Sequence, residues 1–139
     1  MGQITVPITV RNAFDAHRAR LGEIAADSAR SVIVDEALVD TGAYLLCLPG
    51  RLIEALGLEL GDEVNVSTAT GYTTARRFVG AEIEYAGRRR IVDALEMPGG
   101  DHVLLGALPM EALGVEPDLV NRRLRVLPDH GPQTYLTIL

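Results

Sequence analysis

One acidic residue, Asp40, lies in the apolar run ALVDTGAYLLCLP at residues 37–49, directly before Thr41 and Gly42. The run predicts a buried strand that delivers this carboxylate onto a tight turn. An isolated charge there costs several kcal/mol unless another group pairs with it or it takes up a proton. A carboxylate at this position therefore needs an explanation, for which the rest of the sequence supplies a candidate.

Other hydrolytic chemistries find little support. The three histidines, His17, His102 and His130, are far apart in the sequence, and none lies in an HExxH motif. The chain has no GxSxG motif, and it has no lysine with which to complete a glycine-rich phosphate-binding loop. Cys47 is the single cysteine, and its apolar surroundings favour a small buried hydrophobe over a nucleophile. A metal-dependent or Ser-His-Asp hydrolase is therefore disfavoured, and we expect no metal and no cofactor.

Length and composition predict a single domain over residues 1–139. The sequence is 47% hydrophobic and 23% charged, which is typical of a globular protein. The net charge of −6 argues against a nucleic-acid-binding surface, so the arginine clusters at 76–77 and 88–90 are expected to be exposed strand edges. No apolar stretch approaches the roughly 20 residues that span a bilayer, and MGQITV does not resemble a signal peptide. We expect a soluble cytoplasmic protein without a membrane partner.

The patterning predicts a mainly β fold with two short helices. Strands are expected at 3–10, where Pro7 indicates a sheet edge, at 31–39, and in the apolar runs YLLCLP and HVLLG. The helices RLIEAL and ALPMEAL should end at left-handed glycines, Gly57 and Gly114. Residues 72–97 predict a hairpin that turns at Ala86-Gly87. Residues 11–30 show no clean period and are expected to form a long loop or hairpin, in which a helical turn is allowed.

Three segments in this order resemble the retropepsin-like aspartic proteases, in the bacterial type that carries a single motif and forms homodimers. Residues 40–43 match the catalytic Asp-Thr-Gly-Ala motif, and Leu104, Leu105 and Gly106 match the second landmark, an apolar pair and a glycine before a short helix. The stretch STATGYTTARR at 67–77 matches the flap hairpin, whose candidate tip residues are Thr70, Gly71 and Tyr72. The resemblance extends over residues 1 to about 127. It implies a closed β-barrel half with short helices.

The resemblance also implies a mechanism in which two carboxylates share one proton, so that one activates a water and the other protonates the scissile carbonyl. Gly42 would let the backbone approach and donate an N–H to the carboxylate, the Thr41 hydroxyl would bond across to its counterpart, and Ala43 would keep the adjacent space small. Each chain has only one such motif. Asp93 in RIVDALE is a poor second carboxylate, because Ala94 and Leu95 replace the Thr-Gly turn.

The predicted enzyme is therefore an aspartic endopeptidase that cleaves extended peptides and completes its site in a symmetric homodimer, with Asp40 from each subunit. The alternative is a weakly active or inactive module of the same fold that dimerises or binds peptides, with a structural Asp40. The tail after Asp129, where Tyr135, Leu136, Ile138 and Leu139 suggest a terminal strand, fits equally a strand at the dimer interface or at the edge of its own sheet.

Overall fold

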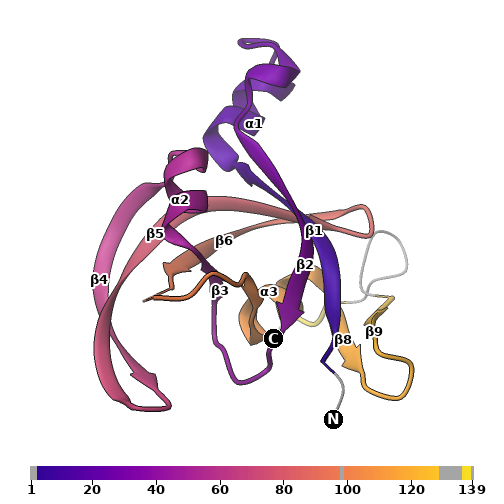
Figure 1. Ribbon diagram of the computed structural model, residues 1–139. Coiled ribbons are helices and arrows are strands. Elements are labelled where there is room, and N and C mark those ends of the chain that lie inside the picture. Colours follow the sequence, from indigo (N-terminus) through magenta and orange to yellow (C-terminus); the bar gives the residue numbers. More distant parts are fainter. Residues whose placement is uncertain (1–2, 98, 129–135, 139) are drawn as a thin grey trace.

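The computed structural model describes residues 3–97, 99–128 and 136–138 and is mainly β (Figure 1). One sheet contains seven strands in the spatial order β1-β2-β7-β3-β6-β5-β4, and β8 and β9 form a separate hairpin. The strands are β1 (Thr5–Asn12), β2 (Ser31–Val39), β3 (Leu46–Leu48), β4 (Glu59–Thr68), β5 (Gly71–Tyr85), β6 (Arg88–Glu96), β7 (Leu104–Leu105), β8 (Val115–Asp118) and β9 (Arg123–Val126). The helices are α1 (Ala13–Arg20), α2 (Gly50–Leu56) and α3 (Ala107–Leu113), with a 3₁₀ turn at Ala26–Ser28.

The sheet closes into a ring because β1 pairs antiparallel with both β2 and β5. The ring is not a regular barrel, since β7 has two residues and β3 has three. The prediction that Pro7 lies at a sheet edge is confirmed for the first half of β1, which pairs with β2, but not for the second half, which also pairs with β5. Pro7 lies at an irregularity of the β1–β2 register between Val6 and Ile8, where a missing N–H is tolerated, and the pairing of β1 with β5 begins only at Thr9.

The interior of the ring holds the hydrophobic core, to which β1 contributes the predicted period-2 face. Ile4, Val6, Ile8 and Val10 are all buried, and they pack in one cluster with side chains from the rest of the sheet and from α2 and α3. Both predicted helices are confirmed. Each ends at a left-handed glycine, Gly57 with φ 61° and Gly114 with φ 69°, as the sequence predicts.

Residues 11 and 12 still belong to β1, and residues 13–30 form a helical projection in place of the expected loop or hairpin, so the chain has three α-helices among its described residues (Figure 1). Asn12 caps α1 by accepting a hydrogen bond from the Asp15 N–H (3.1 Å), and its amide donates to the Leu56 carbonyl of α2 (2.9 Å). The guanidinium of Arg30, at the end of the segment, binds the Asp15 carboxylate (2.7 Å) and so joins the end of the segment to α1. Because only Ala13, Asp15 and Ala16 are buried, α1 has no apolar stripe that the sequence could reveal.

Two hairpins lie where the sequence predicts them. Strands β5 and β6 turn at Ala86 and Gly87, whose φ values are 52° and 78°, as a two-residue turn of type I′ requires. Strands β4 and β5 pair from Glu59↔Val79 to Thr68↔Gly71, which makes Ala69 and Thr70 the turn. This second hairpin curves away from the body at the lower left of Figure 1.

The expectation that all clustered arginines are exposed is wrong for Arg88. Its side chain is buried and donates hydrogen bonds to the carbonyls of Leu113, Gly114 and Leu127, so it ties β6 to the end of α3 and to the segment after β9. At the end of the chain, residues 136–138 adopt no strand, while Tyr135 and Leu139 lie outside the described residues. No helix within the described ranges is long and apolar enough to cross a membrane.

Candidate active site

Asp40 directly follows β2, at a point where the sheet brings two distant segments together. Strand β7 lies between β2 and β3: it runs parallel to β2, with Val39 opposite Leu105, and antiparallel to β3, with Leu46 opposite Leu105. The loop formed by residues 40–45 therefore crosses over the end of β7. The backbone N–H of Asp40 donates to the Leu105 carbonyl (3.1 Å), which fixes the start of this loop against the Leu-Leu-Gly segment.

Within the loop, the backbone folds back onto the Asp40 side chain. The Gly42 N–H donates to Asp40 Oδ1 (2.9 Å), and the Ala43 N–H donates to the Asp40 carbonyl (3.1 Å). A Cβ on Gly42 would lie 3.2 Å from Asp40 Oδ1, so glycine permits this close approach. The Asp40 residue is half-buried, and Thr41 and Gly42 are exposed. The turn thus holds one carboxylate oxygen and leaves the side chain accessible from solvent.

The Leu-Leu-Gly segment at residues 104–106 packs against the Asp40 loop. Gly106 packs so closely under it that an added Cβ would lie 2.3 Å from the Leu45 carbonyl oxygen and 2.7 Å from that of Ala43. The first N–H groups of α3 donate to the same loop: Ala107 to the Ala43 carbonyl (2.9 Å) and Leu108 to the Tyr44 carbonyl (3.0 Å). Residues 104–106, the predicted landmark, and the start of α3 therefore hold the Asp40 loop in place through close packing and backbone hydrogen bonds.

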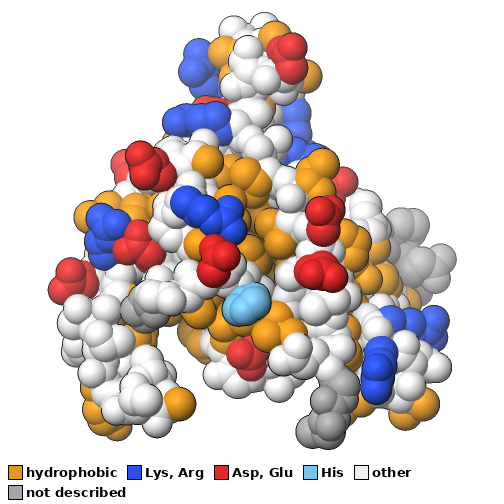
Figure 2. Space-filling model, in the orientation of Figure 1, with side chains coloured by type: hydrophobic (Ala, Val, Ile, Leu, Met, Phe, Trp, Pro, Cys, Tyr) orange, Lys and Arg blue, Asp and Glu red, His pale blue; other side chains and the backbone are white. Residues whose placement is uncertain are grey.

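The flap candidates lie at the tip of the β4–β5 hairpin. Thr70 occupies the turn, Gly71 begins β5 with φ 130°, and Tyr72 is 86% exposed. The Thr68 hydroxyl donates to the Gly71 carbonyl (2.9 Å) and so stabilises the turn. The space-filling view shows the end of this hairpin as an arm separated from the body by an open space (Figure 2). The turn itself is formed by Ala69 and Thr70, so Gly71 and Tyr72 lie on the strand that follows it, and their role as a flap stays a prediction.

The other ionisable candidates lie apart from this arrangement. Asp93 is exposed on β6, where it adds to the stronger effect of the Asp62 carboxylate in raising the pKa of Arg77. Cys47 is buried on β3, and burial, followed by the negative charge of Asp40, raises the pKa of its thiol to about 11. Cys47 is thus a neutral core residue at physiological pH. Among the described residues, no three His, Cys, Asp or Glu side chains form a metal-binding group.

Three features of the site escaped sequence analysis. The insertion of β7 between β2 and β3 and the proximity of Cys47 to Asp40 both depend on long-range strand pairing. The third is Tyr44, which is 70% exposed beside the Asp40 loop. An aromatic residue inside an apolar run is usually taken for a core residue. The signal that could have placed Tyr44 on the turn is its position directly after Gly42 and Ala43.

A comparison with known protein families matches residues 31–108 of this chain to the aspartyl proteases. The match covers more than half of the chain and includes the Asp40 loop, the β4–β5 hairpin and the Leu-Leu-Gly segment. The chain therefore belongs to the aspartyl protease family, and its mainly β ring with short helices is the retropepsin-like form of that fold. A search of curated proteins found no match.

Proposed function

We propose that this chain is an aspartic endopeptidase in which two copies form a symmetric homodimer and each contributes Asp40 to one catalytic pair. The observation that carries the proposal is the Asp40 loop itself. In a member of the aspartyl protease family, it presents a half-buried carboxylate on an Asp-Thr-Gly-Ala turn that is fixed by the Leu105 carbonyl and the Gly42 N–H.

The need for a second carboxylate supports the dimer. One polypeptide has a single Asp-Thr-Gly motif, and Asp93 lies beside Arg77 on another strand. In the proposed dimer, the two Asp40 carboxyl groups meet at the two-fold axis and share one proton. The ionised one takes a proton from a water, whose oxygen attacks the scissile carbonyl carbon, and the protonated one donates to the carbonyl oxygen. The carboxyl group that took the water proton then gives it to the amide nitrogen, and the other carboxylate takes a hydroxyl proton back from the tetrahedral intermediate. The C–N bond breaks, the amine and the new carboxyl product leave, and the pair again holds one proton.

The neighbouring groups have matching roles in this proposal. Gly42 donates its N–H to Asp40 Oδ1 and so holds the carboxylate plane. The Thr41 hydroxyl makes no hydrogen bond with any described residue, which leaves it available to the partner's equivalent loop. Ala43 is half-buried and small, so the space beside the paired carboxylates remains open for a peptide.

The exposed β4–β5 hairpin supports an extended polypeptide as the substrate. Thr70, Gly71 and Tyr72 would close over a peptide that lies across the two Asp40 loops, and the exposed Tyr44 and Tyr72 rings would supply apolar contact area. A hairpin whose end is exposed on every residue from 67 to 74 is suited to such movement.

Replacing Asp40 with asparagine tests the proposal. We expect Asp40→Asn to abolish cleavage of a denatured protein substrate while the protein still sediments as a dimer. Asp93→Asn is the matched control, because it removes the same charge from an exposed strand position, and it should cleave at the wild-type rate. Cleavage that survives in Asp40→Asn would refute the catalytic role, and a wild-type protein that sediments only as a monomer while cleaving would refute the shared site. A wild-type dimer that cleaves no denatured substrate would favour the inactive peptide-binding alternative.

A further inference from the structure

An open pocket of about 490 Å³ lies on the outer face of the sheet, where the end of α1 meets the β5–β6 hairpin. It is lined by Arg20, Glu82, Gly87, Arg89, Arg90 and Ile91. None of these residues belongs to the Asp40 loop, the Leu-Leu-Gly segment or the hairpin tip. The proposed peptidase mechanism therefore leaves this pocket without a role.

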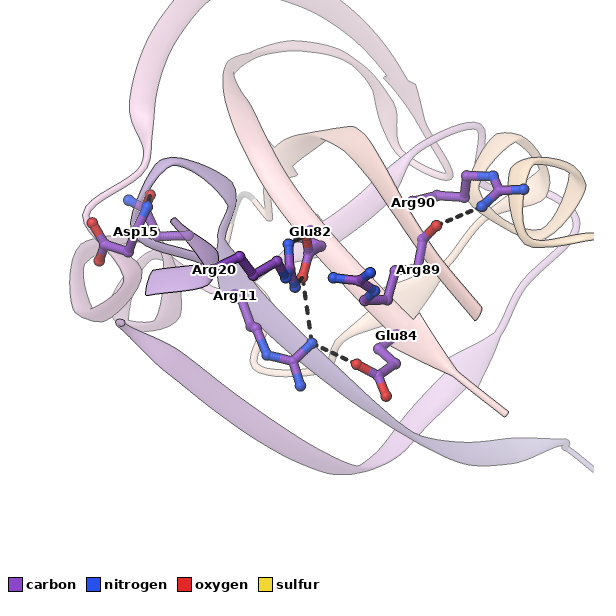
Figure 3. Close-up of polar contacts among 8 residues, drawn as sticks. Arg11, Asp15, Arg20, Glu82, Glu84, Arg89 and Arg90 are labelled. Carbon is purple, nitrogen blue, oxygen red and sulfur yellow. Dashed lines mark hydrogen bonds and ion pairs between the residues drawn. The ribbon is translucent and has the colours of Figure 1, made fainter. Parts of the chain in front are cut away.

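The carboxylates at this pocket already have partners (Figure 3). Glu82 is buried, and both of its oxygens accept hydrogen bonds from Arg20, at 2.6 Å and 2.7 Å. Arg11 binds Glu84 at 2.6 Å and reaches Glu82 at 3.4 Å. Two arginines thus neutralise two glutamates, and this network attaches α1 to β1 and β5.

Two further guanidinium groups at this pocket, those of Arg89 and Arg90, form no ion pair with a carboxylate of any described residue. Arg89 acts on Glu82 only through space, as a minor contributor to the lowered pKa of that carboxyl, whose main cause is the hydrogen bonding of Arg20. Arg90 donates to the Arg89 carbonyl (2.6 Å). Among the described residues, nine of the other arginines form an ion pair with a carboxylate, whereas Arg89, Arg90 and Arg122 form none, and of these three only Arg89 and Arg90 line a pocket. Both are exposed and line the pocket. Because successive side chains of a strand point to opposite faces, Arg89, which pairs with Glu84, starts from the outer face, whereas Arg90, which pairs with Ile83, starts from the other face and its guanidinium lies against the Arg89 carbonyl.

An apolar side chain completes the surface. Ile91 is 65% exposed, and because side chains two apart on a strand share a face, it lies on the same face of β6 as Arg89. The planar guanidinium fork suits the two oxygens of a carboxylate. A ligand that fits this pocket therefore combines single negative charges with an aliphatic group.

We propose that this pocket is a docking site for an acidic segment of a polypeptide, in which carboxylate side chains bind Arg89 and Arg90 and an aliphatic neighbour packs on Ile91. A polypeptide is favoured over nucleic acid or a phosphate compound for two reasons. The pocket wall includes Glu82, with Glu84 nearby, and the whole chain has a net charge of −6, so dense negative charge is repelled. Moreover, the chain has no lysine, and among the described residues that line the pocket none begins a helix.

For an endopeptidase, the docked segment belongs to the substrate, and this part of the inference rests on the proposed function. Strand β6 connects the pocket to the Asp40 loop. Its residue Ala94 pairs with Leu46, which directly follows that loop. Arg89 lies five residues before Ala94 on the same strand, a distance of about 16 Å in an extended chain. A substrate held by both regions therefore needs an acidic segment several residues away from the scissile bond.

Binding to the Asp40→Asn protein tests the site without any requirement for cleavage. The probes are a fluorescein-labelled peptide of alternating glutamate and leucine and the same peptide with glutamine for glutamate, followed by fluorescence anisotropy at low salt. We expect the glutamate peptide to bind at least about tenfold more tightly, and Arg89→Gln/Arg90→Gln to remove about that factor. Binding should weaken as salt is raised, because the contacts are exposed.

The matched control is Arg122→Gln/Arg123→Gln, which removes an equal charge from another exposed tandem pair, on the β8–β9 hairpin. It should bind the peptide like the parent protein. The inference is overturned if the Arg89/Arg90 variant binds normally, if the control loses as much affinity, or if inorganic phosphate or a single-stranded oligonucleotide binds the pocket more tightly than the peptide. Peptide binding in a protein that proves inactive would retain the docking site and refute only the proposed peptidase function.

Discussion

The substitution Gly106→Ala tests whether the close contact between Gly106 and the Asp40 loop holds the candidate site together. Gly106 has φ −83° and ψ −176°, which alanine adopts without strain, so any effect must come from the added methyl group. That group would lie 2.3 Å from the Leu45 carbonyl oxygen and 2.7 Å from that of Ala43. Both are backbone atoms that cannot rotate away, so either the loop or the start of α3 must move by about 1 Å.

The expected loss of stability follows from what this movement disrupts. Two hydrogen bonds join α3 to the loop, from Ala107 to Ala43 and from Leu108 to Tyr44. Each contributes about 0.5–1.5 kcal/mol, and overpacking a tight contact costs about 1–3 kcal/mol, so the free energy of unfolding should fall by about 2–6 kcal/mol. That is a large part of the about 5–15 kcal/mol that stabilises an ordinary domain.

Urea denaturation followed by far-ultraviolet circular dichroism measures the effect, because the chain has no tryptophan for fluorescence. Gly100→Ala is the matched control, since the three described atoms nearest to its added methyl group all belong to the side chain of Met97, whose flexible end is the closest. We expect the control to lose less than about 1 kcal/mol. Equal stability of the two variants would contradict the reasoning that backbone contact at Gly106 supports the Asp40 loop.

Three further predictions concern buried polar groups. Arg88→Met should lower the free energy of unfolding by about 3 kcal/mol, because the carbonyls of Leu113 and Gly114 lose their donor, and urea denaturation that shows no loss would contradict a structural role for this arginine. Arg20 is the main cause of the lowered pKa of Glu82, so this carboxylate stabilises the fold above its usual pKa of 4.5 and the stabilisation is lost as pH falls through the lowered value. Thermal unfolding between about pH 2 and 6 should therefore depend less on pH in Glu82→Gln than in the wild type, whereas an unchanged slope would exclude the ion pair. Cys47, whose thiol pKa is raised from 9.0 to about 11, should react with iodoacetamide at pH 8 about 100-fold more slowly in the folded protein than in urea, and mass spectrometry that finds equal rates would show that it is not buried.

The local elements could be predicted because their signals lie in neighbouring residues. Alternating apolar residues identify β1, and a glycine after each short helix identifies the ends of α2 and α3. The pair Ala86-Gly87 identifies the β5–β6 turn, because few residue pairs adopt positive φ at both positions. The Asp-Thr-Gly-Ala turn and the Leu-Leu-Gly segment could be identified in the same way, because each is a short motif of neighbouring residues with its own backbone geometry.

The pairing of distant segments was decided only by tertiary structure. Nothing near Leu105 in the sequence indicates that β7 lies between β2 and β3, or that β1 reaches β5 beyond Pro7. The burial of Arg88 likewise depends on carbonyls 25 and 26 residues away at the end of α3. Local patterns restrict φ, ψ and the buried face of an element, whereas its partners are selected by the packing of the whole core, in which every strand competes for the same neighbours. The sequence by itself therefore determined which residues form the Asp40 turn, and the closed ring of strands determined what supports it.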